Sequence, residues 1–263
     1  MKRIILLIFL LSTFMLKAQE VPPELVTDRP DQTESSSVVP LNSLQIETGF
    51  LLEKDETNLA SRKSRTWNST LLRYGLLPNL ELRLGLELLQ QEVTVKNPPD
   101  ILKYKGFGPL YTGFKVKLAD EQGWRPETAF LGGLVFPFTA SDDFKPTYTA
   151  ADMRFAFSHS LSPRFSLGYN LGVQWDGESA IPGYFYSLAL GIGITEKLAA
   201  FAESYGLIPE AGSNEHLLDA GMTYLLQPNL QLDFSAGFGL NGAAADRFVS
   251  LGLSYRLPPF SNQ

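Results

Sequence analysis

The sequence predicts an all-β protein, a transmembrane antiparallel up-and-down β-barrel of about 12 strands. Three observations support this prediction. Apolar residues occupy alternate positions over most of the chain, and long and short links alternate between these stretches. The one long apolar run lies at the N-terminus. An even number of antiparallel strands, joined alternately by long loops and short turns, is typical of bacterial outer-membrane barrels.

The N-terminus has the parts of a secretory signal peptide. Lys2 and Arg3 precede a short, mostly apolar run, Ile4–Leu16, and the small residue Ala18 follows. That order of basic, apolar and small residues is typical of signal peptides. An uncleaved membrane anchor is the alternative, but the run is short for a transmembrane helix. We therefore expect residues 1–18 to be removed on export to the cell outer membrane of a Gram-negative bacterium.

The strands are predicted from the period of the apolar residues. Leu80–Leu88 alternates without a miss, and Phe165–Trp175 and Leu230–Leu240 behave in the same way. A strand places alternate side chains on one face, whereas a helix would scatter these residues around its circumference. The expected strands are 43–53, 64–76, 80–93, 109–119, 126–138, 147–160, 164–176, 184–195, 198–207, 216–226, 229–240 and 246–257. The alternation is poor in 126–138 and 198–207, so it is less well defined which side chains of these two strands face the lumen.

The amino-acid composition excludes several kinds of functional site. The chain has no Cys, 2 His and a formal net charge of −6. It therefore has no disulfide or thiolate metal site, and a broad nucleic-acid-binding face is not expected. A soluble sandwich or lipocalin-like barrel is the competing fold. Its second face would be consistently polar, whereas here the non-apolar positions hold mostly Gly, Ala and Ser with single charges among them.

If Leu, Phe and Tyr face lipid, the residues between them face the lumen of the barrel, which we assign to residues 43–263. The ionisable residues expected in the lumen are Glu47, Arg73, Glu81, Arg83, Glu87, Lys115, Lys117, Asp152, Arg154, Asp176, Glu203, Asp219, Asp233 and Arg256. Both signs of charge are present. Two interpretations of these luminal charges remain open. They either pair with one another and rigidify the interior, or they line a polar pathway or binding site.

Residues 19–42 form a polar N-terminal segment without strand periodicity. Asp28, Arg29, Asp31 and Glu34 lie within it. Two interpretations remain open. The segment is either a disordered periplasmic leader, or a plug whose charges pair with those of the lumen.

Several motifs resemble one known family. They are T-D-R-P-D-Q-T-E-S at 27–35, L-Q-I-E-T-G-F at 44–50, L-R-Y-G-L at 72–76, P-N-L-E-L-R-L at 78–84, F-A-E-S-Y-G at 201–206, D-A-G-M-T-Y at 219–224, P-N-L-Q-L-D at 228–233 and G-F-G-L at 237–240. Together they resemble the outer-membrane β-barrel "transporter" family, also described as the putative MetA-pathway of phenol degradation family. The resemblance implies a porin-like membrane protein that moves small, hydrophobic or aromatic compounds.

The sequence shows no catalytic constellation. His159 stands beside Ser160 and Ser162, but Leu161 occupies the position of the serine in the His-x-Ser arrangement of outer-membrane phospholipases. His216 stands alone, and the nucleophile motif G-x-S-x-G does not occur. We therefore expect neither an enzyme nor a metal or other cofactor.

The predicted function is a passive channel or facilitator for small compounds with a narrow, mixed-charge lumen. The first alternative is a structural or adhesin-like barrel with a closed lumen, and the second, disfavoured, is an outer-membrane enzyme. The expected partners are outer-membrane lipid, an unidentified small solute and, during biogenesis, the barrel-assembly machinery. No nucleic-acid partner is expected.

Overall fold

The structure, a computed structural model, describes residues 23–210 and 212–259. The expected signal peptide, residues 1–18, lies outside them. The described strands are β1 (Leu44–Glu56), β2 (Ala60–Leu77), β3 (Leu80–Lys96), β4 (Pro99–Phe107), β5 (Leu110–Ala119), β6 (Glu127–Phe136), β7 (Ala150–Ser160), β8 (Phe165–Trp175), β9 (Gly183–Gly193), β10 (Leu198–Ile208), β11 (Glu215–Gln227), β12 (Leu230–Gly239) and β13 (Arg247–Arg256). Two single-turn 3₁₀ helices, η2 (Pro137–Thr139) and η3 (Asp142–Phe144), lie between β6 and β7. Among the described residues, no helix is long and apolar enough to cross a membrane.

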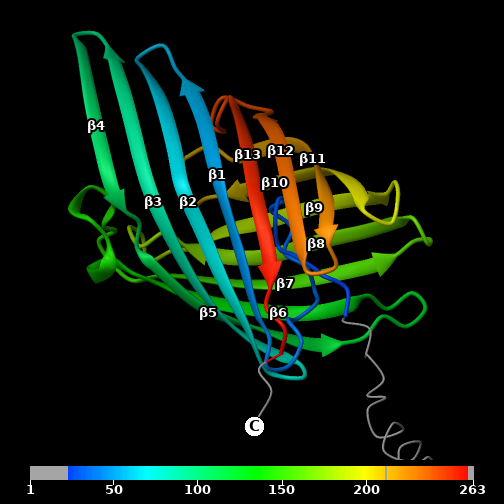
Figure 1. The fold of residues 1–263 in the computed structure, drawn as a ribbon. Coiled ribbons are helices and arrows are strands. Elements are labelled where there is room, and N and C mark those ends of the chain that lie inside the picture. Colours follow the sequence, from blue (N-terminus) through cyan, green and yellow to red (C-terminus); the bar gives the residue numbers. More distant parts are fainter. Residues whose placement is uncertain (1–22, 211, 260–263) are drawn as a thin grey trace, which may run out of the picture.

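Twelve of these strands close into an antiparallel barrel (Figure 1). The first and last strands meet, since β1 pairs with β13 from Gln45↔Arg256 to Lys54↔Arg247. At the other side of the ring, β2 pairs with β3 and β3 with β5. The predicted fold class is therefore confirmed.

One strand was not predicted. β4 lies within residues 94–108, which separate the expected strands 80–93 and 109–119. It folds back on the outer half of β3, from Leu88↔Phe107 to Lys96↔Pro99, while β5 pairs only with Leu80–Gly85 of β3. The long β1–β2 and β3–β4 hairpins consequently project beyond the neighbouring strands (Figure 1).

The distribution of side chains is the reverse of that in a water-soluble protein. On β12, Asp233 is 4% exposed whereas the adjacent Leu232 is 40% exposed. The guanidinium of Arg73 and the ammonium of Lys115 are fully buried, while Leu251 is 57% exposed. An apolar exterior around a polar interior is what a barrel in lipid requires.

Residues 23–42, the described part of the N-terminal segment, enter the barrel at the end where the short turns lie. There the backbone N–H of Asn42 donates to the carbonyl of Gly75 at 2.8 Å, next to the β2–β3 turn. Short turns face the periplasm in such barrels. The segment therefore enters from the periplasmic end and lies inside the ring of strands (Figure 1).

Candidate functional site

The N-terminal segment is hydrogen-bonded around almost the whole inner wall. Side chains of ten of the twelve barrel strands bond to it, and β7 and β11 are the exceptions in the described part of the chain. The partners are Gln45 and Glu47 on β1, Arg73 on β2, Arg83 and Glu81 on β3, Lys115 on β5, Glu127 on β6, Asn170 on β8, Ser187 on β9, Glu203 on β10, Gln231 and Asp233 on β12, and Ser250 and Arg256 on β13.

Asp28 is the centre of this network. Its carboxylate lies 2.7 Å from Arg83, 2.8 Å from Lys115 and 3.1 Å from Arg73. Burial alone raises the pKa of Asp28, but these three cations outweigh it and hold the pKa well below its usual range. Asp28 therefore stays ionised and joins cations from β2, β3 and β5.

Two further ion pairs hold the segment to opposite walls. Both carboxylate oxygens of Glu34 accept from Nη2 of Arg83, at 2.8 and 2.9 Å. Across the barrel, Nη2 of Arg29 donates to Asp233 at 3.1 Å. Its guanidinium lies against Gly49 and Gly252, which face each other on β1 and β13. A Cβ atom on either glycine would collide with the guanidinium, so these glycines make room for Arg29.

The innermost turn of the segment meets an acidic part of the wall. The backbone N–H of Gln32 donates to Glu203 at 2.7 Å, and the hydroxyl of Thr33 donates to the same carboxylate. Asp219 pairs in register with Glu203, and both of its carboxylate oxygens are buried without a hydrogen-bond partner among the described residues. Burial, and then the charges of Glu203 and Asp219, raise the pKa of Asp31 well above its usual range.

This arrangement predicts pH-dependent docking of the segment. An acid whose pKa is raised in the docked state favours docking when protonated, so its contribution is present below about pH 4 and is lost as pH rises through the raised pKa. Release of the segment, measured by its cleavage by an added protease, should therefore increase with pH in the wild type. In Asp31→Asn this dependence should be weaker. The control Asp142→Asn, in the exposed 3₁₀ helix η3, should behave like the wild type, and an unaltered pH response in Asp31→Asn would contradict the prediction.

The ionisable residues expected in the lumen occupy three kinds of position. Nine are buried, at most 6% exposed: Glu47, Arg73, Glu81, Arg83, Lys115, Glu203, Asp219, Asp233 and Arg256. Glu87, Asp152 and Arg154 line a cavity on the extracellular side of the segment. Lys117 lies near the periplasmic end, where it pairs with Asp120 at 2.6 Å and Glu127 at 2.7 Å.

The expectation for Asp176 is wrong. β8 ends at Trp175, and Asp176 lies in the following loop. Its carboxylate accepts backbone N–H bonds from Glu178 and Ser179 at 2.8 and 3.0 Å. It therefore caps a turn outside the barrel wall, a common role of Asp in loops.

Several contact residues were missed. Glu127 accepts from the hydroxyls of Ser36 and Ser37 at 2.7 and 2.9 Å. Its strand alternates poorly because apolar Ala129 and Leu131 share its inward face and are buried. Neutral residues were missed because the luminal residues were selected by their charge. Asn170, for example, is hydrogen-bonded to both the N–H and the carbonyl of Glu34.

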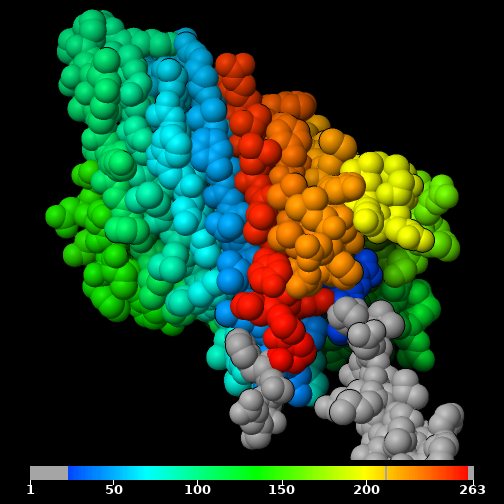
Figure 2. Space-filling model, viewed as in Figure 1, coloured from blue at the N-terminus to red at the C-terminus, as the bar shows by residue number. Residues whose placement is uncertain are grey.

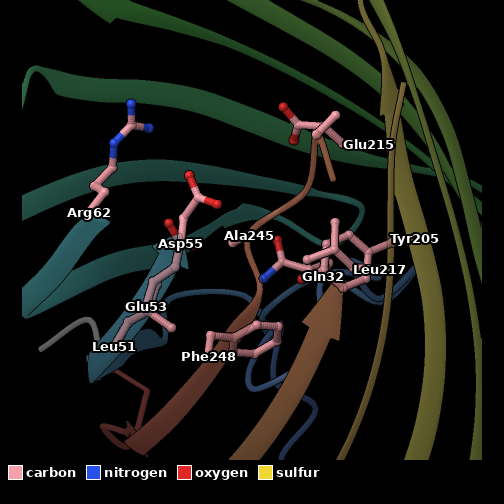
Figure 3. Close-up of a pocket in the computed structure, with 11 residues that line it drawn as sticks. Gln32, Leu51, Glu53, Asp55, Arg62, Tyr205, Glu215, Leu217, Ala245 and Phe248 are labelled. Atoms are coloured by element: carbon pink, nitrogen blue, oxygen red, sulfur yellow. The ribbon is translucent and has the colours of Figure 1, made fainter. Parts of the chain in front are cut away.

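Cavities lie on both sides of the segment. On the extracellular side are two neighbouring cavities of about 550 and 350 Å³, which share Gln32, Leu51 and Phe248 and which we call the outer chamber. The lining of the smaller one includes three acidic side chains, Glu53, Asp55 and Glu215, and one basic side chain, Arg62 (Figure 3). A third cavity, of about 300 Å³, lies at the periplasmic end beside Lys117 and Arg256.

Neither histidine lies in a cluster typical of catalysis. Nδ1 of His216 is hydrogen-bonded to the hydroxyl of Tyr186 at 2.8 Å, and His159 stacks on Tyr169. Within the described residues, no group of three or more His, Asp or Glu is arranged to hold a metal ion.

Residues 27–257 match the family described as "Putative MetA-pathway of phenol degradation". The fold is similar to that of an outer-membrane channel from Pseudomonas putida F1, with a TM-score of 0.63 and 13% identity over 84% of this chain and 98% of that one. It is also similar to the translocator domain of the autotransporter NalP from Neisseria meningitidis (TM-score 0.53, 11% identity, 82% and 88% coverage) and to the KdgM porin (0.50, 8%, 81% and 98%). No curated protein sequence matches significantly.

Proposed function

Since the chain belongs to the "Putative MetA-pathway of phenol degradation" family, we propose that it is an outer-membrane channel for small solutes in which the N-terminal segment acts as a plug. The observation that carries the proposal is the ring of hydrogen bonds from the segment to ten strands of the wall. A barrel that only needed a filled interior could use its own side chains. Here a polar segment from outside the barrel occupies the bore, with cavities on either side of it.

Transport would be passive. When the plug is displaced, a solute would pass from the outer chamber through the mixed-charge lumen to the periplasmic end. The larger cavity of the outer chamber, about 550 Å³, is within the range of small-molecule sites. Its lining includes Tyr111, Phe248 and Leu71 beside Arg154 and Asp152, which suits small aromatic or hydrophobic compounds with a polar group.

The alternative of a structural barrel with a closed lumen has one observation in its favour. The buried charges are densely paired, as between Arg73 and Glu81 at 2.9 Å. We propose no enzymatic activity, because the similar folds named above are a channel, a translocator domain and a porin. We also propose that residues 1–18 direct export of the chain as a signal peptide. The barrel-assembly machinery would then insert the barrel into the outer membrane.

The test is conductance of the purified protein in planar bilayers, together with solute flux into liposomes. A variant lacking residues 20–38 should conduct continuously, whereas the wild type should conduct only in brief openings. Heat-modifiable gel mobility would establish that both barrels are folded. If a folded deletion variant neither conducts nor passes solute, the channel proposal fails.

The acidic lining of the outer chamber predicts a preference for cations. Like charges on a concave wall concentrate counter-ions at its surface. The reversal potential in a tenfold KCl gradient should therefore indicate a cation-to-anion permeability ratio of about two or more. Glu53→Gln with Glu215→Gln should bring the ratio toward one, and Glu210→Gln, in a loop, should not. An anion preference in the wild type would refute this prediction.

A further inference from the structure

The outer face of the projecting hairpins carries a row of apolar side chains that faces away from the lumen. Residues paired across antiparallel strands share a face. Leu88 pairs with Phe107, and Phe50 with Leu251. The ring of Trp67 packs at a tilt against that of Phe50, with the ring centroids 5.4 Å apart. Phe107 and Trp67 are 62% and 50% exposed, so this row contacts the surroundings of the barrel.

This row marks the extracellular edge of the apolar band. From Trp67 down to Leu77, the last residue of β2, the strand advances by ten residue-to-residue steps. At a rise of about 3.3 Å per residue and a tilt of about 40°, they span ~25 Å along the membrane normal, the height of the apolar band of such barrels. Trp is also enriched at membrane interfaces. The next residues of the outer face therefore lie at the level of the lipid headgroups.

Basic residues outnumber acidic ones in the next two rows of the same face, where Leu52, Val249 and Gln90 also lie in the first row. Arg65 pairs with Gln90, and Gln90 with Lys105. One row further out, Lys54 pairs with both Lys63 and Arg247. Lys63 also pairs with Glu92, and Glu92 with Lys103. Figure 2 shows that β13, β1, β2 and β3 form one continuous surface on this side of the molecule. We call Lys54, Lys63, Arg65, Lys103, Lys105 and Arg247 the basic patch.

The protein itself neutralises the basic patch only in part. Lys54 pairs with Glu56 at 2.7 Å and Lys103 with Glu92 at 3.7 Å. For Lys63, Arg65, Lys105 and Arg247, the described residues offer no carboxylate within 4.0 Å. Cations placed directly opposite each other across strands repel, so the row Lys63–Lys54–Arg247 is unfavourable unless an anion lies over it. The patch stands out on a chain whose net charge is −6.

We propose that the basic patch binds the phosphate groups of an anionic glycolipid in the outer leaflet of the membrane. Arg and Lys are the side chains that bind phosphate, and clusters of them at a membrane surface recognise anionic headgroups. The row of Phe107, Trp67 and Phe50 lies directly below, where the acyl chains of that lipid begin. The proposal rests on the membrane placement of the barrel and is independent of its transport function.

The experiment uses native mass spectrometry of the full-length barrel in detergent, titrated with bisphosphorylated lipid A and with the same lipid after removal of its phosphates. Three proteins are compared. They are the wild type, the patch variant Lys63→Gln/Arg65→Gln/Arg247→Gln, and a control that loses the same charge from exposed sites elsewhere, Lys145→Gln/Arg164→Gln/Lys197→Gln. Heat-modifiable mobility shows that each is folded. If the patch variant does not fold, Lys103→Gln/Lys105→Gln on the edge strand β4 replaces it.

The wild type and the control should bind the bisphosphorylated lipid at least about tenfold more tightly than the patch variant does. The wild type should also bind the phosphate-free lipid at least about tenfold more weakly. Equal affinity of the patch variant and the control would overturn the proposal. Equal affinity of the wild type for the lipid with and without phosphate would overturn it as well. Loss of conductance bears only on the proposed channel and leaves this result unaffected.

Discussion

A disulfide between positions 33 and 187 should lock the channel closed, and its reduction should restore the openings of the wild type. Thr33 lies in the N-terminal segment and Ser187 on β9, and their hydroxyl oxygens are 2.7 Å apart. Cβ atoms carrying such close oxygens lie near the separation that a disulfide needs. The sequence has no Cys, so Thr33→Cys/Ser187→Cys introduces the only possible pair. The bond would tie the innermost turn of the plug to the wall.

The measurement is conductance of the double variant in planar bilayers before and after reduction. Oxidised protein, with the bond verified by mass, should show no openings above background, and the reduced protein should open as the wild type does. Each single-cysteine variant controls for the loss of the two hydroxyls and should not respond to the reductant. If the cross-linked protein conducts like the wild type, the N-terminal segment is not the gate.

Most of the barrel could be predicted because lipid on one side and a polar lumen on the other impose a strict period of two. Leu80–Leu88 has that period without a miss, and β3 begins at Leu80. β4 could not be predicted in this way. Its partner is the part of β3 that extends beyond the bilayer, where Gln90, Gln91 and Glu92 replace the apolar residues. Polar and apolar residues are mixed on both faces of that hairpin, as the pairs Val93↔Leu102 and Glu92↔Lys103 show, so no clear alternation reveals it.

The sequence predicts the candidate site only as two separate sets of charged residues, one on the luminal face of the strands and one in the N-terminal segment. The period of two indicates that Arg83 and Lys115 face inward, and composition indicates that Asp28 lies in a polar segment. Which charges meet depends on contacts between residues far apart in the chain. Asp28 and Lys115 are 87 positions apart, and Arg29 and Asp233 are 204 apart. Neutral partners such as Asn170 and Ser187 have no distinguishing pattern, because other buried serines, such as Ser235, occupy equivalent inward positions without a hydrogen bond to the segment.

The central network should also make Arg73 the most destabilising cation to remove. Its guanidinium lies 2.7 Å from Glu47, 2.9 Å from Glu81 and 3.1 Å from Asp28, all buried. Breaking a buried ion pair by removing one partner costs about 3–5 kcal/mol, because the other charge is left without compensation. Arg73→Gln should therefore lower the free energy of unfolding by about that amount. Urea unfolding in lipid vesicles, followed by the fluorescence of the 3 Trp residues, would measure it.

A second substitution separates the charge from the packing of Arg73. Glu81 and Asp28 retain Arg83 close by, at 3.1 and 2.7 Å, whereas Arg73 is the one cation paired with Glu47 in the described residues. Adding Glu47→Gln to Arg73→Gln should therefore recover about half of the lost stability, because it removes the carboxylate left unpaired. The control is Lys96→Gln, which removes a cation from an exposed pair with Glu56 and should cost less than about 1 kcal/mol. If the double variant is less stable than Arg73→Gln alone, the loss comes from packing and hydrogen bonds, and the charge balance of the lumen does not hold the plug in place.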